Sequence, residues 1–166
     1  MKKWLNKKQT GITLIELLVV ISILIVLTGL TTINVLHARH QSILTASVDT
    51  FIADLKQQQL KAMVGDTEGR NDSDNYGIHF GTNTYTLFHG TYSSNDQTNS
   101  TIQLGDNIQL SSITFPGSQI IFLKNSGEIS GFDQNPNKNT ITLVDISNNL
   151  QKKITINRYG IITKIE

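Results

Sequence analysis

The feature that most constrains this chain is an uncharged, largely apolar run of 20 residues from Leu17 to Leu36. As an α-helix, a run of this length measures about 30 Å, which matches the hydrocarbon core of a bilayer. Four lysines precede it within the first eleven residues. The positive-inside rule places such an end in the cytoplasm, so the sequence predicts a single-pass anchor in the cytoplasmic (inner) membrane. The C-terminal part is then expected outside the membrane.

One carboxylate, Glu16, lies at the start of the apolar segment, between Ile15 and Leu17. An ionised group in a membrane is costly and by default marks a function that involves a specific partner. The segment from 12 to 36 contains no basic residue that could pair with it. We therefore expect its partner to be another group or another chain.

Three simpler interpretations compete for the same segment. A secretory signal peptide would have a shorter apolar core, closed by a small-residue cleavage site that is missing here. A plain signal anchor would explain everything except Glu16 and the Gly11 junction. A buried core helix of a soluble protein disagrees with the four lysines that precede the run.

The N-terminal residues resemble the class III signal of type IV prepilins and pseudopilins. The resemblance is carried by Lys7, Lys8, Gly11 and the stretch ITLIE from Ile12 to Glu16, followed by LLVVISILIVL. It implies that a prepilin peptidase removes residues 1–11 by cutting after Gly11, and then methylates the new N-terminal residue, Ile12. Family members usually have Phe at that place, so Ile12 is a departure. Glu16 matches the glutamate that is fifth in the mature chain.

This resemblance also suggests how subunits assemble. Cleavage creates an ammonium at Ile12, and the Glu16 carboxylate of one subunit can neutralise the Ile12 ammonium of a neighbour. Both charges would otherwise stay unpaired in an apolar helix bundle, at a cost of several kcal/mol. The implied partners are other pilin-like subunits, the prepilin peptidase, the inner-membrane assembly platform and, before assembly, membrane lipid.

An amphipathic stretch, residues 37–65, continues the apolar one, residues 12–36. Its apolar residues fall near a 3.6-residue spacing, which is typical of a helix packed on one face. They are Leu44, Val48, Phe51, Ile52, Leu55 and Met63. Because Gly65 and Asp66 form a stop signal, we expect one helix from Ile12 to Val64.

Residues 66–166 are expected to form a β-rich domain. The runs 76–80 and 84–88 predict a hairpin around Gly81-Thr82-Asn83. Further strands are expected at 101–104, 108–113, 119–124, 128–130, 140–146, 152–157 and 161–165. The predicted fold class is α+β and pilin-like, with a long N-terminal helix packed on an antiparallel β domain.

Several stretches of the second part are similar to the GspH/FimT-type minor pseudopilins. They are DLKQQQLKAMVGDTEGR, YGIHFGTNTYTLF, ITFPGSQIIFLKNSGEISGF and KKITINRYGIITKI. Some FimT-like minor pilins bind DNA, which directs attention to Lys152, Lys153, Arg158 and Lys164. Beyond residue 11, however, the chain has 10 basic and 13 acidic residues, which argues against a general nucleic-acid binder. A solvated hairpin face is the simpler interpretation of these four residues.

No metal, cofactor or catalytic site is expected. The chain has no cysteine, and it lacks the GxSxG, HExxH and P-loop motifs. The loop 66–75 is rich in oxygen ligands, and some pseudopilins bind calcium. A calcium loop beginning at Asp72 would place Tyr76 fifth and Asn83 twelfth, which is a poor match to the EF-hand pattern.

These observations favour a minor pilin or pseudopilin that initiates or caps a filament of a type II secretion, pilus or DNA-uptake system. The alternative is a filament-tip protein that contacts DNA or an exported substrate through its β domain. A membrane-anchored enzyme is the third possibility, and it would require a pocket with convergent ionisable groups.

Overall fold

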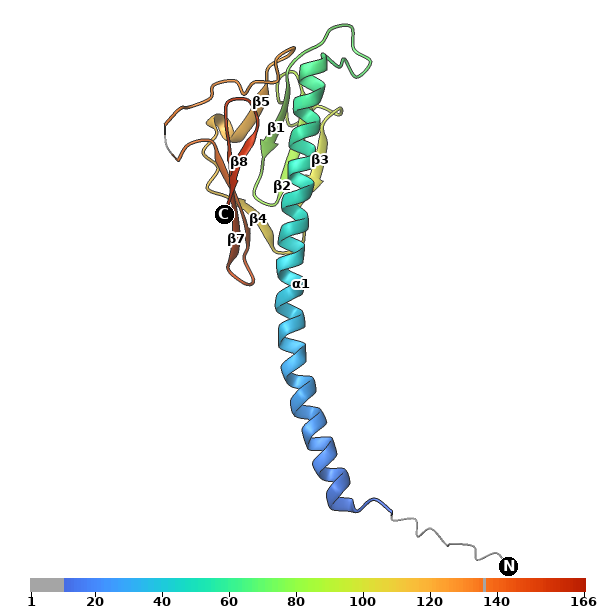
Figure 1. The fold of residues 1–166 in the computed structure, drawn as a ribbon. Coiled ribbons are helices and arrows are strands. Elements are labelled where there is room, and N and C mark those ends of the chain that lie inside the picture. Colours follow the sequence, from blue (N-terminus) through green and yellow to red (C-terminus); the bar gives the residue numbers. More distant parts are fainter. Residues whose placement is uncertain (1–10, 136) are drawn as a thin grey trace, which may run out of the picture. The chain divides into compact units, whose positions relative to one another are not determined.

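The structure is a computed structural model that describes residues 11–135 and 137–166, apart from the side chains of residues 30–38. The chain divides into two units, Met1–Arg39 and His40–Glu166. The long helix α1 (Leu14–Val64) contributes to both (Figure 1). It starts two residues after the predicted start and ends at the predicted residue. Most of the predicted leader lies outside the described residues.

In the second unit, α1 buries one face against the β domain. Leu44, Val48, Phe51 and Leu55 are all less than 5% exposed, as their spacing predicted. The face continues through Gln58 and Ala62, because successive steps of four and three residues keep it on one side of the helix. The prediction for Met63 was wrong. It lies one position beyond this face and is 51% exposed.

The predicted helix stop is confirmed. Gly65 adopts a left-handed conformation with φ of 66°, which glycine reaches without steric cost. The Asp66 amide donates to the Lys61 carbonyl at 3.0 Å, and the Asn125 amide donates to the Ala62 carbonyl at 2.8 Å. These bonds satisfy carbonyls that the end of a helix would otherwise leave unpaired.

The first sheet has the strand order β3-β2-β1-β5, and every neighbouring pair is antiparallel. The predicted hairpin is confirmed and joins the two central strands. Gly77 in β1 leaves room for the Phe88 ring, because a Cβ atom there would lie 2.3 Å from that ring. The strands are β1 (Tyr76–Phe80), β2 (Thr84–His89), β3 (Ser100–Gln103) and β5 (Gln119–Phe122).

The second sheet has the order β4-β6-β7-β8 and is also antiparallel. Its strands are β4 (Ile108–Ser111), β6 (Thr140–Asp145), β7 (Leu150–Ile156) and β8 (Ile162–Ile165). A short 3-10 helix, η1 (Pro116–Ser118), precedes β5. No strand forms at 128–130, where one was predicted: Ile129 makes a single bridge to Phe122, and the Ser130 amide donates to the Ile121 carbonyl of β5 at 2.8 Å.

The core of this unit forms where α1 and the two sheets meet. It includes Phe51 from the helix, Ile78 and Ile120 from the first sheet, and Leu143 and Ile154 from the second, all fully buried. The Phe51 ring lies edge-on to Tyr85, with centroids 5.4 Å apart. The α+β class with antiparallel sheets is therefore confirmed.

Candidate functional site

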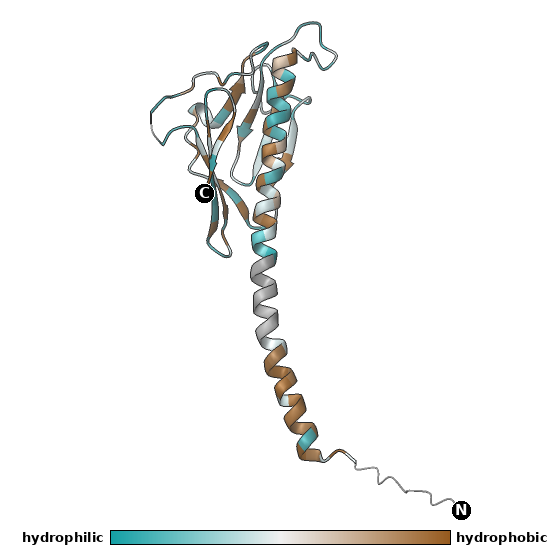
Figure 2. Cartoon of the chain, viewed as in Figure 1, coloured by the Kyte–Doolittle hydropathy of each residue, from teal (hydrophilic) through white to brown (hydrophobic). Residues whose placement is uncertain are grey.

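The N-terminal unit presents an apolar surface to its surroundings. The large aliphatic side chains from Ile12 to Leu27 are all at least 47% exposed. Figure 2 shows this part of α1 as predominantly hydrophobic. Because exposed apolar area of this extent is unfavourable in water, the surface is one that lipid or neighbouring apolar helices would cover. Within the described residues, no helix meets the length and hydropathy required of a membrane span.

The start of α1 places the predicted processing and assembly residues close together. Gly11 and Ile12 precede the helix and are exposed. The Glu16 amide donates to the Thr13 hydroxyl at 3.3 Å, which caps the helix. Glu16 lies in the first turn, where the helix dipole favours a negative charge. No ion pair of its carboxylate is present among the described residues.

The basic residues considered for DNA contact do not form one cluster. Lys152 and Lys153 are adjacent on β7, so their side chains leave opposite faces of the sheet. Lys164 is paired with Glu166 at 2.6 Å, and Arg158 makes a 2.8 Å ion pair with Glu128. Lys152 and Lys153 thus lie on opposite faces of the sheet and Arg158 lies in a turn. The charges of Arg158 and Lys164 are neutralised by the glutamates they pair with.

The loop 66–75, which was weighed as a calcium site, uses several of its oxygens in local bonds. One Asp66 oxygen accepts from the Glu68 amide at 2.9 Å, and one Asp74 oxygen accepts from the Asn75 amide at 2.7 Å. Glu68 pairs with Lys61. No set of three or more His, Asp or Glu side chains in the described part of the chain could hold a metal ion.

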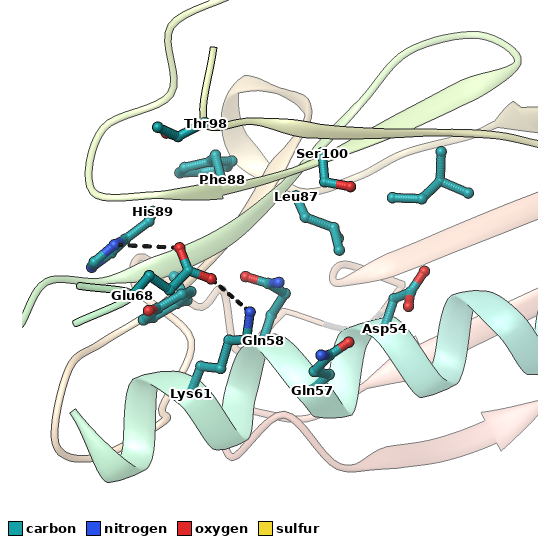
Figure 3. Close-up of a pocket in the computed structure, with 12 residues that line it drawn as sticks. Asp54, Gln57, Gln58, Lys61, Glu68, Leu87, Phe88, His89, Thr98 and Ser100 are labelled. Atoms are coloured by element: carbon teal, nitrogen blue, oxygen red, sulfur yellow. Dashed lines mark hydrogen bonds and ion pairs between the residues drawn. The ribbon is translucent and has the colours of Figure 1, made fainter. Parts of the chain in front are cut away.

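A polar cluster lies where the end of α1 meets the end of β2 (Figure 3). Lys61 Nζ is 2.6 Å from Glu68 Oε1, and Glu68 Oε2 is 3.7 Å from His89 Nδ1. The His89 ring stacks on Tyr76, with centroids 4.3 Å apart, and its side chain is 1% exposed. Burial is the main cause that lowers the pKa of His89, and the nearby Arg70 guanidinium adds to it. His89 is therefore neutral at physiological pH.

Tyr76 belongs to the same cluster. Its hydroxyl donates to the Asp66 carbonyl at 2.9 Å. Burial, followed by the negative charges of Glu68 and Asp66, raises the pKa of Tyr76 to about 12. The phenol therefore stays protonated and serves to hold the loop against β1.

A contact between an aspartate and a histidine joins α1 to the second sheet. Asp145, at the end of β6, is 1% exposed, and its Oδ2 lies 3.4 Å from His40 Nδ1. The Asn148 amide and the Ser147 backbone amide donate to the same carboxylate. The bond from Asn148 is the largest cause that lowers the pKa of Asp145. The carboxylate is thus ionised and held by three groups.

Sequence reasoning did not identify the cluster around His89. In the structure, His79 lies outside the core but stacks on Tyr92 at 3.9 Å, so a loop residue covers it. No signal in the sequence joins Gln58, Glu68 and His89, because they come from the helix, the loop after it and the end of β2, which meet only in the folded domain.

Comparison with known proteins addresses the N-terminal segment directly. Residues 6–32 match the family model described as "Prokaryotic N-terminal methylation motif". Together with the apolar start of α1 and the antiparallel β domain, this match defines the class. The chain carries a prepilin-type methylation motif ahead of an α+β domain. The resemblance of Gly11 to Glu16 to this motif is therefore confirmed.

The other comparisons concern the whole chain. No match is found among curated proteins. Among solved structures, the chain is similar to the minor pseudopilin EpsH from the Type 2 Secretion System of Vibrio cholerae. The two are 19% identical, the similarity covers 74% of this chain and 94% of the other, and the TM-score is 0.49.

Proposed function

We propose that the chain is a minor pilin or pseudopilin, which is cut after Gly11, methylated at Ile12 and built into a type IV pilus-like filament. In this role it initiates or caps a filament that serves secretion, pilus formation or DNA uptake. Its partners are other pilin-like subunits, the prepilin peptidase and the inner-membrane assembly platform. The observation that carries the proposal is the methylation motif at residues 6–32.

The charges at the start of α1 support this role. Cleavage would place an ammonium at Ile12, at the positive end of the helix dipole, where a cation is unfavourable. Glu16 lies one turn further along, and its carboxylate has no ion-pair partner among the described residues. A neighbouring subunit that aligns its Glu16 with this ammonium would neutralise both charges and favour one axial position.

Mass spectrometry of the purified native protein tests the processing step. The expected N-terminus is a monomethylated Ile12, with residues 1–11 removed. Replacement of Gly11 by a bulkier residue should leave the leader attached. A native protein that still begins with its lysine-rich segment would disprove the proposal.

The variant Glu16→Val tests the assembly step. It should still insert in the membrane and lose incorporation into filaments, because the ammonium would have no counter-charge. Asp49→Asn is a matched control, since Asp49 is an exposed carboxylate on the same helix. Sheared filament fractions, probed for each variant, give the readout. Normal incorporation of Glu16→Val would refute the charge-pairing step.

The initiating or capping role has its own test. A minor subunit should be far less abundant in sheared filaments than the main subunit, and its deletion should lower the number of filaments rather than their diameter. Quantitative mass spectrometry and electron microscopy measure these quantities. A chain that forms the bulk of the filament would contradict the minor role.

A further inference from the structure

A cavity of about 290 Å³ lies between the C-terminal half of α1 and the ends of β2 and β3. Figure 3 shows its lining: Asp54, Gln57, Gln58 and Lys61 rise from the helix toward the strand residues opposite them. The polar cluster around His89 closes one end. None of the residues predicted from sequence to act in processing, assembly or DNA contact lines this cavity.

Two side chains on the helix, those of Gln58 and Asp54, each have an oxygen that accepts no hydrogen bond from the described residues. Gln58 is 3% exposed, and its carbonyl oxygen Oε1 has no hydrogen-bond partner. Asp54 lies one helical turn earlier, so the two side chains are neighbours on the same face. The Tyr85 hydroxyl donates to Asp54 Oδ2 at 2.5 Å, and no hydrogen bond to Oδ1 occurs among the described residues. A buried carbonyl without a donor is unfavourable, and a ligand that donates would relieve it.

The charge of the cavity favours a cation. At the far end, Lys61 and Glu68 neutralise each other at 2.6 Å, and the buried His89 is neutral. The Asp54 carboxylate is therefore the charge in the lining that no basic side chain balances.

The opposite wall is apolar. Leu87 of β2 and Ile102 of β3 are both half-buried and line the cavity across from the helix. A methylene chain can pack on such a wall while a charged head group reaches the acceptors, as lysine side chains commonly do.

We propose that this cavity binds a primary ammonium on an aliphatic stem, namely the lysine side chain of a partner polypeptide. The ammonium donates to Gln58 Oε1 and to the Asp54 carboxylate, and the stem packs on Leu87 and Ile102. This site does not depend on the filament role proposed above, because no residue of the methylation motif contributes to it.

Titration of the full-length chain in detergent with Nα-acetyl-lysine amide, followed by ¹H–¹⁵N NMR, tests the site. Saturable shifts are expected at residues that line the cavity, with half-saturation near millimolar. Nα-acetyl-norleucine amide has the same stem without the ammonium and should produce no saturable shift. Equal shifts with both compounds, or none with the lysine compound, would overturn the proposal.

Variants identify the acceptors. Asp54→Asn and Gln58→Met should each lower the affinity for the lysine compound at least tenfold. Asp49→Asn, on the exposed side of the helix, should leave that affinity unchanged. Spectral dispersion reports whether each variant is folded. If Gln58→Met fails to fold, Asp54→Asn still tests the site, because its amide oxygen can accept the hydrogen bond from Tyr85. Unchanged affinity in Asp54→Asn would refute the assignment. Binding of pentylamine without binding of the lysine compound would rule out a polypeptide as the source of the ammonium.

Discussion

His89 shows how a single side chain can make a domain sensitive to acid. Its ring is buried against Tyr76, neither ring nitrogen has a hydrogen-bond partner, and Glu68 lies 3.7 Å from Nδ1. Because burial lowers its pKa in the folded chain, the unfolded chain binds a proton more readily. Stability that depends on neutral His89 is fully present above the unfolded pKa of about 6.5 and is lost as the pH falls below it.

We therefore expect the folded chain to lose stability between pH 7.5 and 5, before the carboxylates titrate. His89→Phe keeps the stack on Tyr76 and removes the titration, so its melting temperature should fall less over this range. Part of the dependence should remain, because burial also lowers the pKa of His79. Thermal melts of both chains at four pH values measure the difference. Parallel pH profiles would contradict this account of His89.

Thr13 and Glu16 also have a local role besides the one proposed in assembly. The order Thr-x-x-Glu is a capping box, in which the first side chain accepts from the amide of the fourth residue. The structure contains that bond at 3.3 Å. A variant at Glu16 therefore also affects the first helical turn, so the membrane insertion of Glu16→Val has to be measured beside its incorporation into filaments.

At the scale of elements, α1 has one face that carries its stability. Leu55 is fully buried, and Leu60, five residues later, is 59% exposed. Leu55→Ala should cost about 2–5 kcal/mol of unfolding free energy, because it leaves a cavity in the core. Leu60→Ala should cost about 0.5 kcal/mol or less, as a surface substitution. Chemical denaturation of both variants makes the comparison, and equal losses would show that the helix face is misassigned.

The centre of the first sheet depends on a residue without a side chain. A Cβ atom at Gly77 would lie 2.3 Å from the Phe88 ring and 2.7 Å from the Ile120 carbonyl oxygen. Since that oxygen is backbone, Gly77→Ala should destabilise the domain by about 1–3 kcal/mol or more. Gly131→Asn is a suitable control, because its surroundings are open and Asn tolerates a left-handed conformation. Denaturation midpoints that are equal for both variants would contradict the prediction.

At the scale of the whole molecule, the buried hydrophobic core that the described side chains form lies between Leu44 and Ile156. The fragment His40–Glu166 should therefore fold without the N-terminal unit. We expect a cooperative urea transition and a near-ultraviolet circular dichroism spectrum with fixed aromatic signals. A fragment that melts without cooperativity would show that the first unit contributes to the core.

Local patterns in the sequence predicted the parts of this fold that depend on local interactions. The helix face from Leu44 to Leu55 follows from its spacing, and the β1–β2 hairpin follows from the turn at Gly81. The division into two sheets could not be predicted in this way, since β4 pairs with β6 across some thirty intervening residues. The lysine-binding cavity escaped prediction for the same reason. Gln58 and Leu87 meet only through tertiary structure, and a lone buried glutamine has no sequence signature.

The contact between His40 and Asp145 has a mechanical consequence. His40 is the first residue of the second unit, so tension applied through the N-terminal part of α1 reaches this contact before the core. Beyond it, the buried side chains from Leu44 to Ala62 hold the same helix to the β domain. Because these contacts share one continuous helix, they are expected to separate together. A pulled subunit should therefore yield abruptly.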